Sequence, residues 1–346
     1  MTRTSVSSGP TPIFRHGMLP DIAAALSSRL VGQPALAAAI LPRLAVADAG
    51  MLAPNRPAGV FMLLGPTGTG KTHSVEVLAE ALHDSPRYMI RVDCGEFQMD
   101  HEIAKLIGAP PGYLGHRETQ PWFTQPKMNA ITSENCGLSI VLFDEIEKSA
   151  ISLRQLILGV LDKATLRLGD SSTVSFEHTL IFMTSNCGAA GVARELRGGL
   201  GFGGAERDTD AAAGRKALSA LRRDFSPEFI NRIDEVIQFS PLNRDDLSAI
   251  LDLLIDELNK RISETRLTGA FTIRLAPKAR RWLLDRGTSA EYGARELRRT
   301  VERHILHPIA AALSAGEAPD KFVAVNESGG ELTISLCAPK VKEAAG

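Results

Sequence analysis

The sequence predicts an α/β protein in which a doubly wound parallel sheet is followed by a smaller C-terminal α+β domain. Short apolar runs alternate with helical stretches between residues 59 and 240, a longer helical period then begins, and two strand-like runs follow near the C-terminus. Strands that alternate with helices in this way form parallel sheets covered on both faces. With 346 residues, the chain exceeds what one core usually organises, so we expect two domains.

Five short runs in the first domain are predicted as strands of one sheet. They are mostly apolar without strict alternation, which is typical of parallel strands buried on both faces. Helical stretches such as "SVEVLAEALH" and "SLRQLILGVLDK" separate them. The five runs are "GVFMLL", "YMIRVD", "LSIVLF", "TLIFMT" and "EVIQF".

Two alanine-rich helices are predicted ahead of the first strand. Asp21 is a candidate cap for a helix through "IAAALSSRL", and Pro34 stands near the start of a second helix, "QPALAAAILPRLAVADAG". Residues 1–20 lack a continuous apolar core after their first positive charge, so they do not match a secretory signal. We expect residues 1–20 to form a flexible tail and residues 21–240 to form the large domain.

Residues 241–346 are predicted to form the small domain. The long period of "RDDLSAILDLLIDELNKRI" and the shorter "PKARRWLLDRG" indicate helices, and a further helix is predicted over residues 294–313. The runs "FVAVNE" and "ELTISL" flank a Gly-Gly pair, which is typical of a tight β-hairpin turn.

Composition excludes several classes of protein. The formal net charge is −1, so there is no global basic field to attract nucleic acid or an anionic membrane, and we expect neither partner. The apolar runs are far shorter than the roughly 18 residues that span a bilayer. The four cysteines lie apart without a Cys-x-x-Cys pair, which favours a reducing compartment and predicts a cytoplasmic location.

The segment "GPTGTGKT" matches the phosphate-binding pattern Gly-x-x-x-x-Gly-Lys-[Ser/Thr] between a predicted strand and a predicted helix. Glycines let backbone N–H groups turn inward to cradle phosphates, and the helix N-terminus favours anions. The lysine adds a positive charge, and the final threonine supplies a hydroxyl for Mg²⁺. The sequence therefore predicts an ATP and Mg²⁺ site at Gly65, Pro66, Thr67, Gly68, Thr69, Gly70, Lys71 and Thr72.

Two carboxylates follow the strand in "SIVLFDEIEK", at the edge where ligands bind in such sheets. Asp144 is predicted to hold Mg²⁺, and Glu145 to polarise a water for attack on the γ-phosphate. Such a pair alone is more often a solvated strand end, and the phosphate loop in the same sheet favours the catalytic interpretation. Asn186 ends another strand, "TLIFMTSN", where its amide can hydrogen-bond the same water.

Together these motifs resemble the AAA+ ATPases of the Clp type, ring-forming unfoldases that include disaggregating chaperones and the ATPase partners of the Clp peptidase. The resemblance covers roughly residues 25–340, and motifs in a fixed order are more specific than any single one. In chain order they are "RLVGQ", "PNRPAGVFMLLGPTGTGKT", "IGAPPGYLG", "VLFDEIEKS", "MTSN", "FSPEFINRIDEVIQF" and "YGARELRR".

The resemblance implies further site residues. Val31 and Gly32 resemble the segment that lines the adenine pocket, and Asn186 matches the first sensor of the γ-phosphate. Arg232 resembles an arginine finger that reaches ATP on the neighbouring subunit, and Arg295 resembles a second sensor carried by a lid domain. These arginines imply a homo-oligomeric ring, a hexamer by analogy. Without the family, Arg232 reads as a surface partner of Asp234 or Glu235, and Arg295 as a partner on the helix face of Glu296.

Two loops complete the resemblance. Tyr113 and Leu114, between glycines, are similar to the pore loop that grips substrate polypeptide, with packing under their own loop as the alternative. Leu200, Gly201 and Phe202 are similar to the loop by which some members dock a Clp-type peptidase. A glycine-rich loop that tucks one phenylalanine onto its own domain is the commoner structure.

The sequence also departs from the family pattern. Almost nothing precedes Asp21, which predicts a single-ring form resembling the C-terminal ATPase module, and residues 116–137 replace a shorter link after the pore loop. The predicted function is an ATP-driven protein unfoldase or remodelling chaperone. One alternative is an AAA+ switch acting on DNA, of the clamp-loader or helicase-loader type, and another is a nucleotide-gated scaffold. The aromatic loop and the lack of basic excess argue against the first, and Glu145, Asn186 and Arg232 argue against the second.

Overall fold

The computed structural model describes most of the chain as two compact units. Unit 1 comprises Met1–Pro66 and Gly70–Ser240, and unit 2 comprises Thr67–Thr69 and Pro241–Gly346. The description below covers residues 13–15, 17–108, 121–186, 219, 221–264, 271–289, 293–316 and 322–335.

A parallel sheet of five strands, in the order β2-β3-β6-β1-β7, organises unit 1. The central pairing joins β1 to β6 along its whole length, from Gly59 opposite Leu180 to Leu64 opposite Ser185. All five predicted strands are present, which confirms the α/β fold class. Their bounds are β1 Gly59–Leu64, β2 Ile90–Asp93, β3 Ser139–Asp144, β6 Thr179–Ser185 and β7 Glu235–Gln238.

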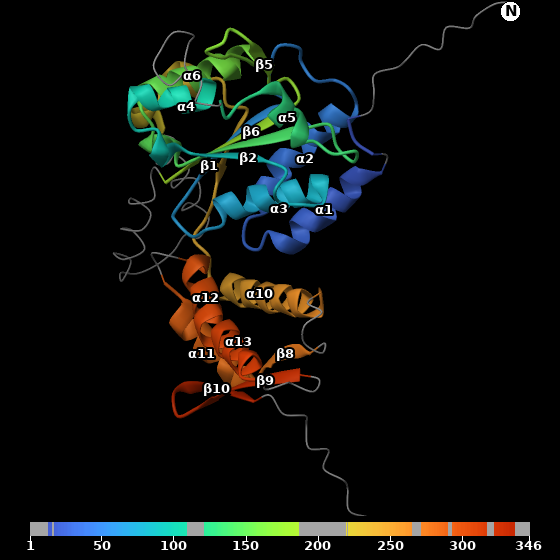
Figure 1. The fold of residues 1–346 in the computed structure, drawn as a ribbon, viewed down its shortest axis with the longest axis vertical. Helices are drawn as coiled ribbons and strands as arrows, with labels where there is room; N and C mark the ends of the chain where they lie inside the picture. The colour runs from blue at the N-terminus through green and yellow to red at the C-terminus, as the bar shows by residue number, and fades with distance from the viewer. Residues whose placement is uncertain are drawn as a thin grey trace, which may run out of the picture. The chain divides into compact units, whose positions relative to one another are not determined.

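Helices cover both faces of this sheet (Figure 1). Successive side chains of a strand point to opposite faces. In β1, Phe61 and Leu63 pack into the core beneath α1, α2 and α3. Val60 and Met62 pack into the opposite core, which includes residues of α4, α6 and α9. The central strands are therefore buried on both sides, which explains their apolar, non-alternating sequences.

The helices of unit 1 are α1 Met18–Arg29, α2 Pro34–Asp48, α3 Lys71–His83, α4 Ala104–Ile107, α5 Gln125–Ala130, α6 Ile151–Lys163 and α9 Pro227–Ile230. Short 3₁₀ turns occur at η1 Cys94–Glu96, η2 Asp100–Ile103 and η3 Ile146–Lys148, and β4 Thr165–Arg167 pairs with β5 Thr173–Ser175 as a small hairpin. Within the described ranges of both units, none of the helices combines the length and hydropathy that crossing a bilayer requires.

The prediction of a flexible tail is wrong for the described residues between 13 and 20. Phe14 is 3% exposed and forms an antiparallel bridge with Cys136. Helix α1 begins at Met18, which is also buried, so Asp21 lies in its first turn and does not cap it. The physical reason is that these apolar side chains complete the core beneath α1 to α3, a contact with a segment more than a hundred residues away.

The segment after the predicted pore loop joins the core from residue 121 onward. The N–H groups of Trp122 and Phe123 donate to the carbonyl oxygens of Lys105 and Leu106, at 3.1 and 3.2 Å. Phe123 is 1% exposed and packs edge-on against Phe176. The described part of the 116–137 segment therefore supports the sheet.

Unit 2 consists of helices packed on a three-stranded sheet in the order β10-β9-β8. Gly329 and Gly330, both with positive φ (65° and 86°), make the tight turn between the antiparallel β9 and β10. Strand β8, which pairs in parallel with β9, was not predicted. The elements are α10 Arg244–Glu264, β8 Thr272–Leu275, α11 Pro277–Gly287, α12 Ala294–Val301, a π turn Glu302–Leu306, α13 His307–Ser314, β9 Phe322–Ser328 and β10 Glu331–Ser335.

Candidate active site

The phosphate-loop motif joins the end of β1 to the start of α3, as its pattern predicts. Gly65 follows β1, and a Cβ at this position would lie 2.5 Å from the carbonyl oxygen of Phe239, so no side chain fits there. Gly70 has φ 96° and immediately precedes α3, a backbone conformation that glycine adopts at little cost. The glycines therefore shape a loop that ends on a helix N-terminus, which suits an anion.

Lys71, the first residue of α3, is 8% exposed and held in place. Its Nζ donates to the carbonyl oxygens of Gly65 and Pro66, at 2.7 and 2.8 Å, and to Oδ1 of Asn186 at 2.8 Å. A buried ammonium fixed among these oxygens is oriented before any phosphate arrives. This arrangement fits the predicted role of Lys71 as a phosphate-binding cation.

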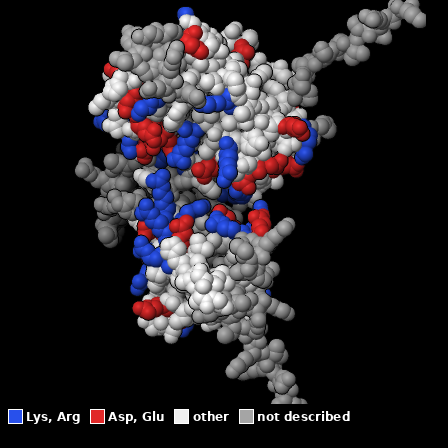
Figure 2. All heavy atoms as spheres, in the orientation of Figure 1, with Lys and Arg blue, Asp and Glu red and all other residues white. Residues whose placement is uncertain are grey.

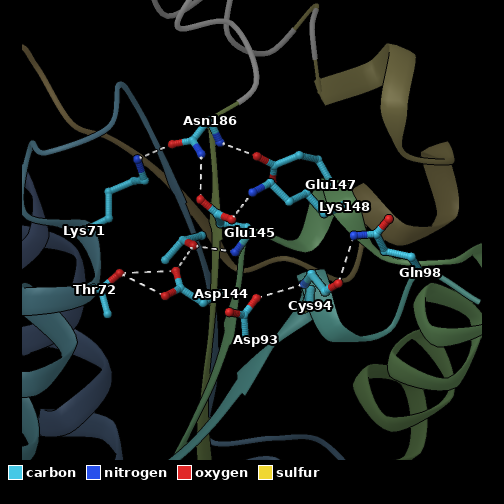
Figure 3. Close-up of polar contacts among 12 residues, drawn as sticks. Lys71, Thr72, Asp93, Cys94, Gln98, Asp144, Glu145, Glu147, Lys148 and Asn186 are labelled. Atoms are coloured by element: carbon cyan, nitrogen blue, oxygen red, sulfur yellow. Dashed lines mark hydrogen bonds and ion pairs between the residues drawn. The ribbon is translucent and has the colours of Figure 1, made fainter. Parts of the chain in front are cut away.

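Asn186 connects Lys71 to Glu145 (Figure 3). The Asn186 side-chain amide donates to Oε1 of Glu145 at 3.3 Å, and its backbone N–H donates to Oε1 of Glu147 at 2.9 Å. The other oxygen of Glu145, Oε2, forms an ion pair with Lys148, and this hydrogen bond raises the pKa of Lys148. Glu145 and Asn186 thus lie together, and their partners Glu147 and Lys148 were not predicted.

Glu145 follows β3 with a left-handed backbone, φ 56° and ψ 50°. Non-glycine residues rarely adopt this conformation, and it is found disproportionately at functional sites. The Glu145 N–H donates to Oγ1 of Thr184 at 2.9 Å, which stabilises the turn. The turn separates the directions of Asp144 and Glu145, so the two adjacent carboxylates have different partners.

Asp144, the last residue of β3, is 7% exposed. The Thr72 hydroxyl lies 3.2 Å from both of its carboxylate oxygens, and the Thr184 hydroxyl also donates to it. Arg91 donates to Oδ2 of Asp144 at 2.6 Å. Hydroxyl and carboxylate oxygens are the donors that Mg²⁺ prefers, so Thr72 and Asp144 fit the predicted metal site.

Arg91 and Thr184 were not predicted as site residues from the sequence. Both are near the carboxyl ends of strands, in "YMIRVD" and "MTSN". These ends meet at one edge of a parallel sheet, which indicates the region of the site but not a contact with Asp144.

The Val31–Gly32 turn connects α1 and α2, and Gly32 has φ 72°. The next residue, Gln33, is buried and forms two hydrogen bonds with the backbone of Ser240, at 2.9 Å to the carbonyl and 3.3 Å from the N–H. Gln33 therefore ties the predicted adenine-pocket turn to the segment that follows β7. Sequence reasoning did not single out this glutamine.

The two predicted arginines belong to different units, Arg232 to unit 1 and Arg295 to unit 2. Arg232, in the turn after α9, forms an ion pair with Asp162 at 2.7 Å. Of its two expected surface partners, Asp234 pairs with Arg43 and Arg56. Arg295 is exposed in α12 of unit 2.

The predicted pore residues Tyr113 and Leu114 lie outside the described residues, as do Leu200, Gly201 and Phe202 of the predicted docking loop.

Two buried thiols of unit 1 are not nucleophiles. Burial, with the nearby charge of Asp144 as a smaller cause, raises the pKa of Cys94 well above its usual range. Burial raises the pKa of Cys136 to about 12. Both thiols are therefore protonated near neutral pH.

Two family models match the chain. The AAA domain model (Cdc48 subfamily) matches residues 56–236, from just before β1 to the first half of β7. The model of the C-terminal, D2-small domain of ClpB protein matches residues 242–325.

Similar proteins agree with these matches. "Chaperone protein ClpB" of Corynebacterium efficiens is 35% identical over 90% of this chain and 33% of that protein, and ClpB of Mycobacterium tuberculosis is 38% identical over 85% and 31%. A solved S. cerevisiae Hsp104:casein complex in its extended conformation has a TM-score of 0.76 and 27% identity, covering 92% of this chain and 53% of that one. A closed-state Hsp104 structure with ATPγS and FITC casein has a TM-score of 0.75 and 28% identity, covering 91% of this chain and 51% of that one.

The chain spans about a third of the length of these ClpB relatives. The resemblance to Clp-type AAA+ ATPases that the ordered motifs predict is confirmed. The chain belongs to the AAA domain family (Cdc48 subfamily).

Proposed function

We propose that this chain hydrolyses ATP and uses the energy to unfold or remodel proteins. The observation that carries the proposal is the continuous network from the phosphate-loop Lys71 through Asn186 to Glu145. Family membership implies a nucleotide-binding site, and this network links that site to a carboxylate suited to activating water.

Each residue of the network has a distinct task. Lys71 and the N–H groups of the phosphate loop bind the phosphates, and Asn186 orients Glu145 toward them. Glu145 accepts a proton from the attacking water. Thr72 and Asp144 would hold Mg²⁺, which when bound neutralises negative charge on the phosphates. Val31 and Gly32 would contact the adenine.

A ring explains the position of Arg232. Its guanidinium is paired with Asp162, about 40% exposed, and is not part of this chain's own network. An arginine that stabilises the charge of phosphoryl transfer can be supplied in trans. We propose that Arg232 serves the neighbouring subunit in a homo-oligomeric ring, a hexamer by analogy, and that Arg295 senses the nucleotide.

Protein is the substrate class that the relatives favour. The similar Hsp104 structures contain casein, and the similar curated proteins are chaperones. We propose that Tyr113 and Leu114 grip polypeptide in the pore. Docking of a Clp-type peptidase at Leu200, Gly201 and Phe202, like a cytoplasmic location, is proposed from the sequence.

Replacing Glu145 tests the catalytic proposal. Glu145→Gln keeps the shape and a hydrogen-bonding oxygen but removes the negative charge, so ATP binding should persist while turnover falls by about two orders of magnitude or more. Steady-state ATPase and fluorescent-nucleotide binding measure the two effects. Glu134→Gln, the same change at an exposed site, is the matched control and should turn over normally. Unchanged turnover in Glu145→Gln would refute the assignment.

The same variant separates the substrate classes. ATP-loaded Glu145→Gln should retain unfolded casein, since a stalled motor does not release its substrate, and Glu134→Gln should not accumulate it. Retention of single-stranded or duplex DNA would favour the loader alternative, and an empty oligomer would favour the scaffold. On the visible face of unit 1, basic and acidic side chains are interspersed, and this surface does not favour the DNA alternative (Figure 2).

A further inference from the structure

We propose that the Arg91 guanidinium neutralises the carboxylate of Asp144, a candidate Mg²⁺ ligand, while the metal is absent. Arg91 thereby weakens the affinity of the nucleotide site for Mg²⁺. The inference rests on the proposed function, because it concerns the metal that accompanies ATP. It assigns Arg91 as a positioning residue that acts through Asp144.

The geometry places Arg91 directly on the candidate metal ligand. Its Nη2 lies 2.6 Å from Oδ2 of Asp144, which is shorter than the 3.2 Å between Asp144 and the Thr72 hydroxyl. Asp144 is 7% exposed and is also contacted by the Thr184 hydroxyl. Within the described part of the chain, Arg91 is therefore the charged partner of Asp144, and the other two partners are neutral hydroxyls.

Charge explains why this contact opposes the metal. A buried carboxylate without a compensating cation is strongly unfavourable, so Arg91 stabilises Asp144 in the metal-free site. A metal ion at Thr72 and Asp144 draws on the same negative charge and weakens the bond to Arg91. By linkage, the effect is reciprocal: because Mg²⁺ binding weakens the bond between Arg91 and Asp144, this bond weakens the binding of Mg²⁺.

The Arg91 side chain also has a second acceptor near Asp144. Strand β2 is at the edge of the sheet, and the Arg91 side chain is 46% exposed. Its Nη1 lies 4.0 Å from Oε1 of Glu76 on α3. Glu76 can therefore receive the guanidinium when Asp144 turns to the metal. The edge position, the partial exposure and the second acceptor together make Arg91 displaceable.

Mg²⁺ titration of nucleotide binding tests the proposal. Binding of a fluorescent ADP is measured in EDTA and then at increasing free Mg²⁺. Arg91→Ala should lower the Mg²⁺ concentration for half-maximal enhancement about tenfold, since it removes a charge-assisted hydrogen bond that opposes the metal. Arg91→Gln, which keeps an N–H donor without charge, should also lower the half-maximal Mg²⁺ concentration, but by a smaller factor. Arg87→Ala removes an exposed arginine from the same segment and should leave it unchanged.

Thermal melting gives a second readout that does not need nucleotide. Without Mg²⁺, Arg91→Ala should melt below wild type, because Asp144 loses its cation, and Mg²⁺ with ADP should narrow the gap. A half-maximal Mg²⁺ concentration that is unchanged or higher in both Arg91 variants would overturn the proposal. If wild type itself fails to bind the nucleotide with Mg²⁺, the proposed function falls and the inference with it.

Discussion

At the scale of single residues, Glu145 shows how the site is held. Its left-handed backbone costs on the order of 1 kcal/mol for a residue with a Cβ. Three contacts offset this cost: the Glu145 N–H donates to the Thr184 hydroxyl, and Asn186 and Lys148 contact the Glu145 carboxylate. The carboxylate is therefore held by Asn186, which follows β6, and by Lys148 in the turn that follows Glu145 itself, so a change at either residue should disturb its position.

His83 carries the main pH dependence that we predict for stability. Its ring is 3% exposed, stacks on Tyr88 and lies 2.9 Å from Oγ of Ser133. Burial lowers its pKa from 6.5 to about 4. Between these values the unfolded chain binds more protons than the folded chain, so the free energy of unfolding falls as pH drops from 6.5 to 4. Above pH 6.5 this penalty is absent.

Replacing His83 by Gln should remove that dependence. Urea denaturation across pH 4 to 7 should show wild type losing on the order of 2 to 3 kcal/mol more than His83→Gln over the acid range. His73→Gln, at an exposed histidine on the same helix, should follow the wild-type curve. Parallel curves for wild type and His83→Gln would contradict the prediction.

The site residues that the sequence predicts are those that a short, continuous stretch of sequence identifies without information from other strands. Lys71 follows from a continuous motif, and Asp144 from an apolar run that ends in acid. Arg91, Thr184 and Lys148 were missed because their roles depend on neighbours from other strands or on a turn conformation. Their sequence neighbours alone do not specify these contacts.

At the scale of elements, the same distinction separates what was predicted from what was not. Strands β1, β3 and β6 are buried along their whole length and carry a strong signal, whereas the four-residue edge strands β2 and β7 include exposed residues. Strand β8 has only four residues, two of them polar or charged, and owes its existence to pairing with β9. The π turn within the predicted helix 294–313 reflects Pro308, whose missing N–H cannot continue the regular bonding pattern.

The N-terminal segment offers a test at this scale. Phe14 is 3% exposed and belongs to the core beneath α1 to α3, so it acts as a structural element of unit 1. Phe14→Ala should lower the free energy of unfolding by about 3 kcal/mol, as for other large-to-small core changes. Urea denaturation followed by tryptophan fluorescence and circular dichroism measures it. Met51→Ala removes an apolar side chain that is 74% exposed and should cost less than about 0.5 kcal/mol. Equal costs for both variants would mean that the segment is not part of the core.

For the whole molecule, the exposure of the Arg232–Asp162 pair bears on assembly. The Arg232–Asp162 pair has both side chains about 40% exposed, and such pairs stabilise a protein by roughly 0 to 1 kcal/mol. If Arg232 serves a neighbouring subunit as proposed, it can exchange Asp162 for the phosphates of that subunit's nucleotide at little cost. A heterologous, head-to-tail contact of this kind closes into a ring when its rotation permits.

Mixed oligomers test whether Arg232 acts in trans. Arg232→Ala subunits keep the phosphate loop, and Lys71→Ala subunits keep the arginine, so each pure oligomer should lose most ATPase activity. In an equal mixture about a quarter of the head-to-tail interfaces pair an intact loop with an intact arginine, and ATPase should partly recover. Mixing Arg232→Ala with the Lys71→Ala/Arg232→Ala double variant is the matched control, because no interface then holds both groups. Native mass spectrometry establishes that mixed oligomers form. Recovery in the first mixture alone requires that the arginine of one subunit serve the nucleotide of another. Absence of recovery in proven mixed oligomers would place the action of Arg232 within its own chain.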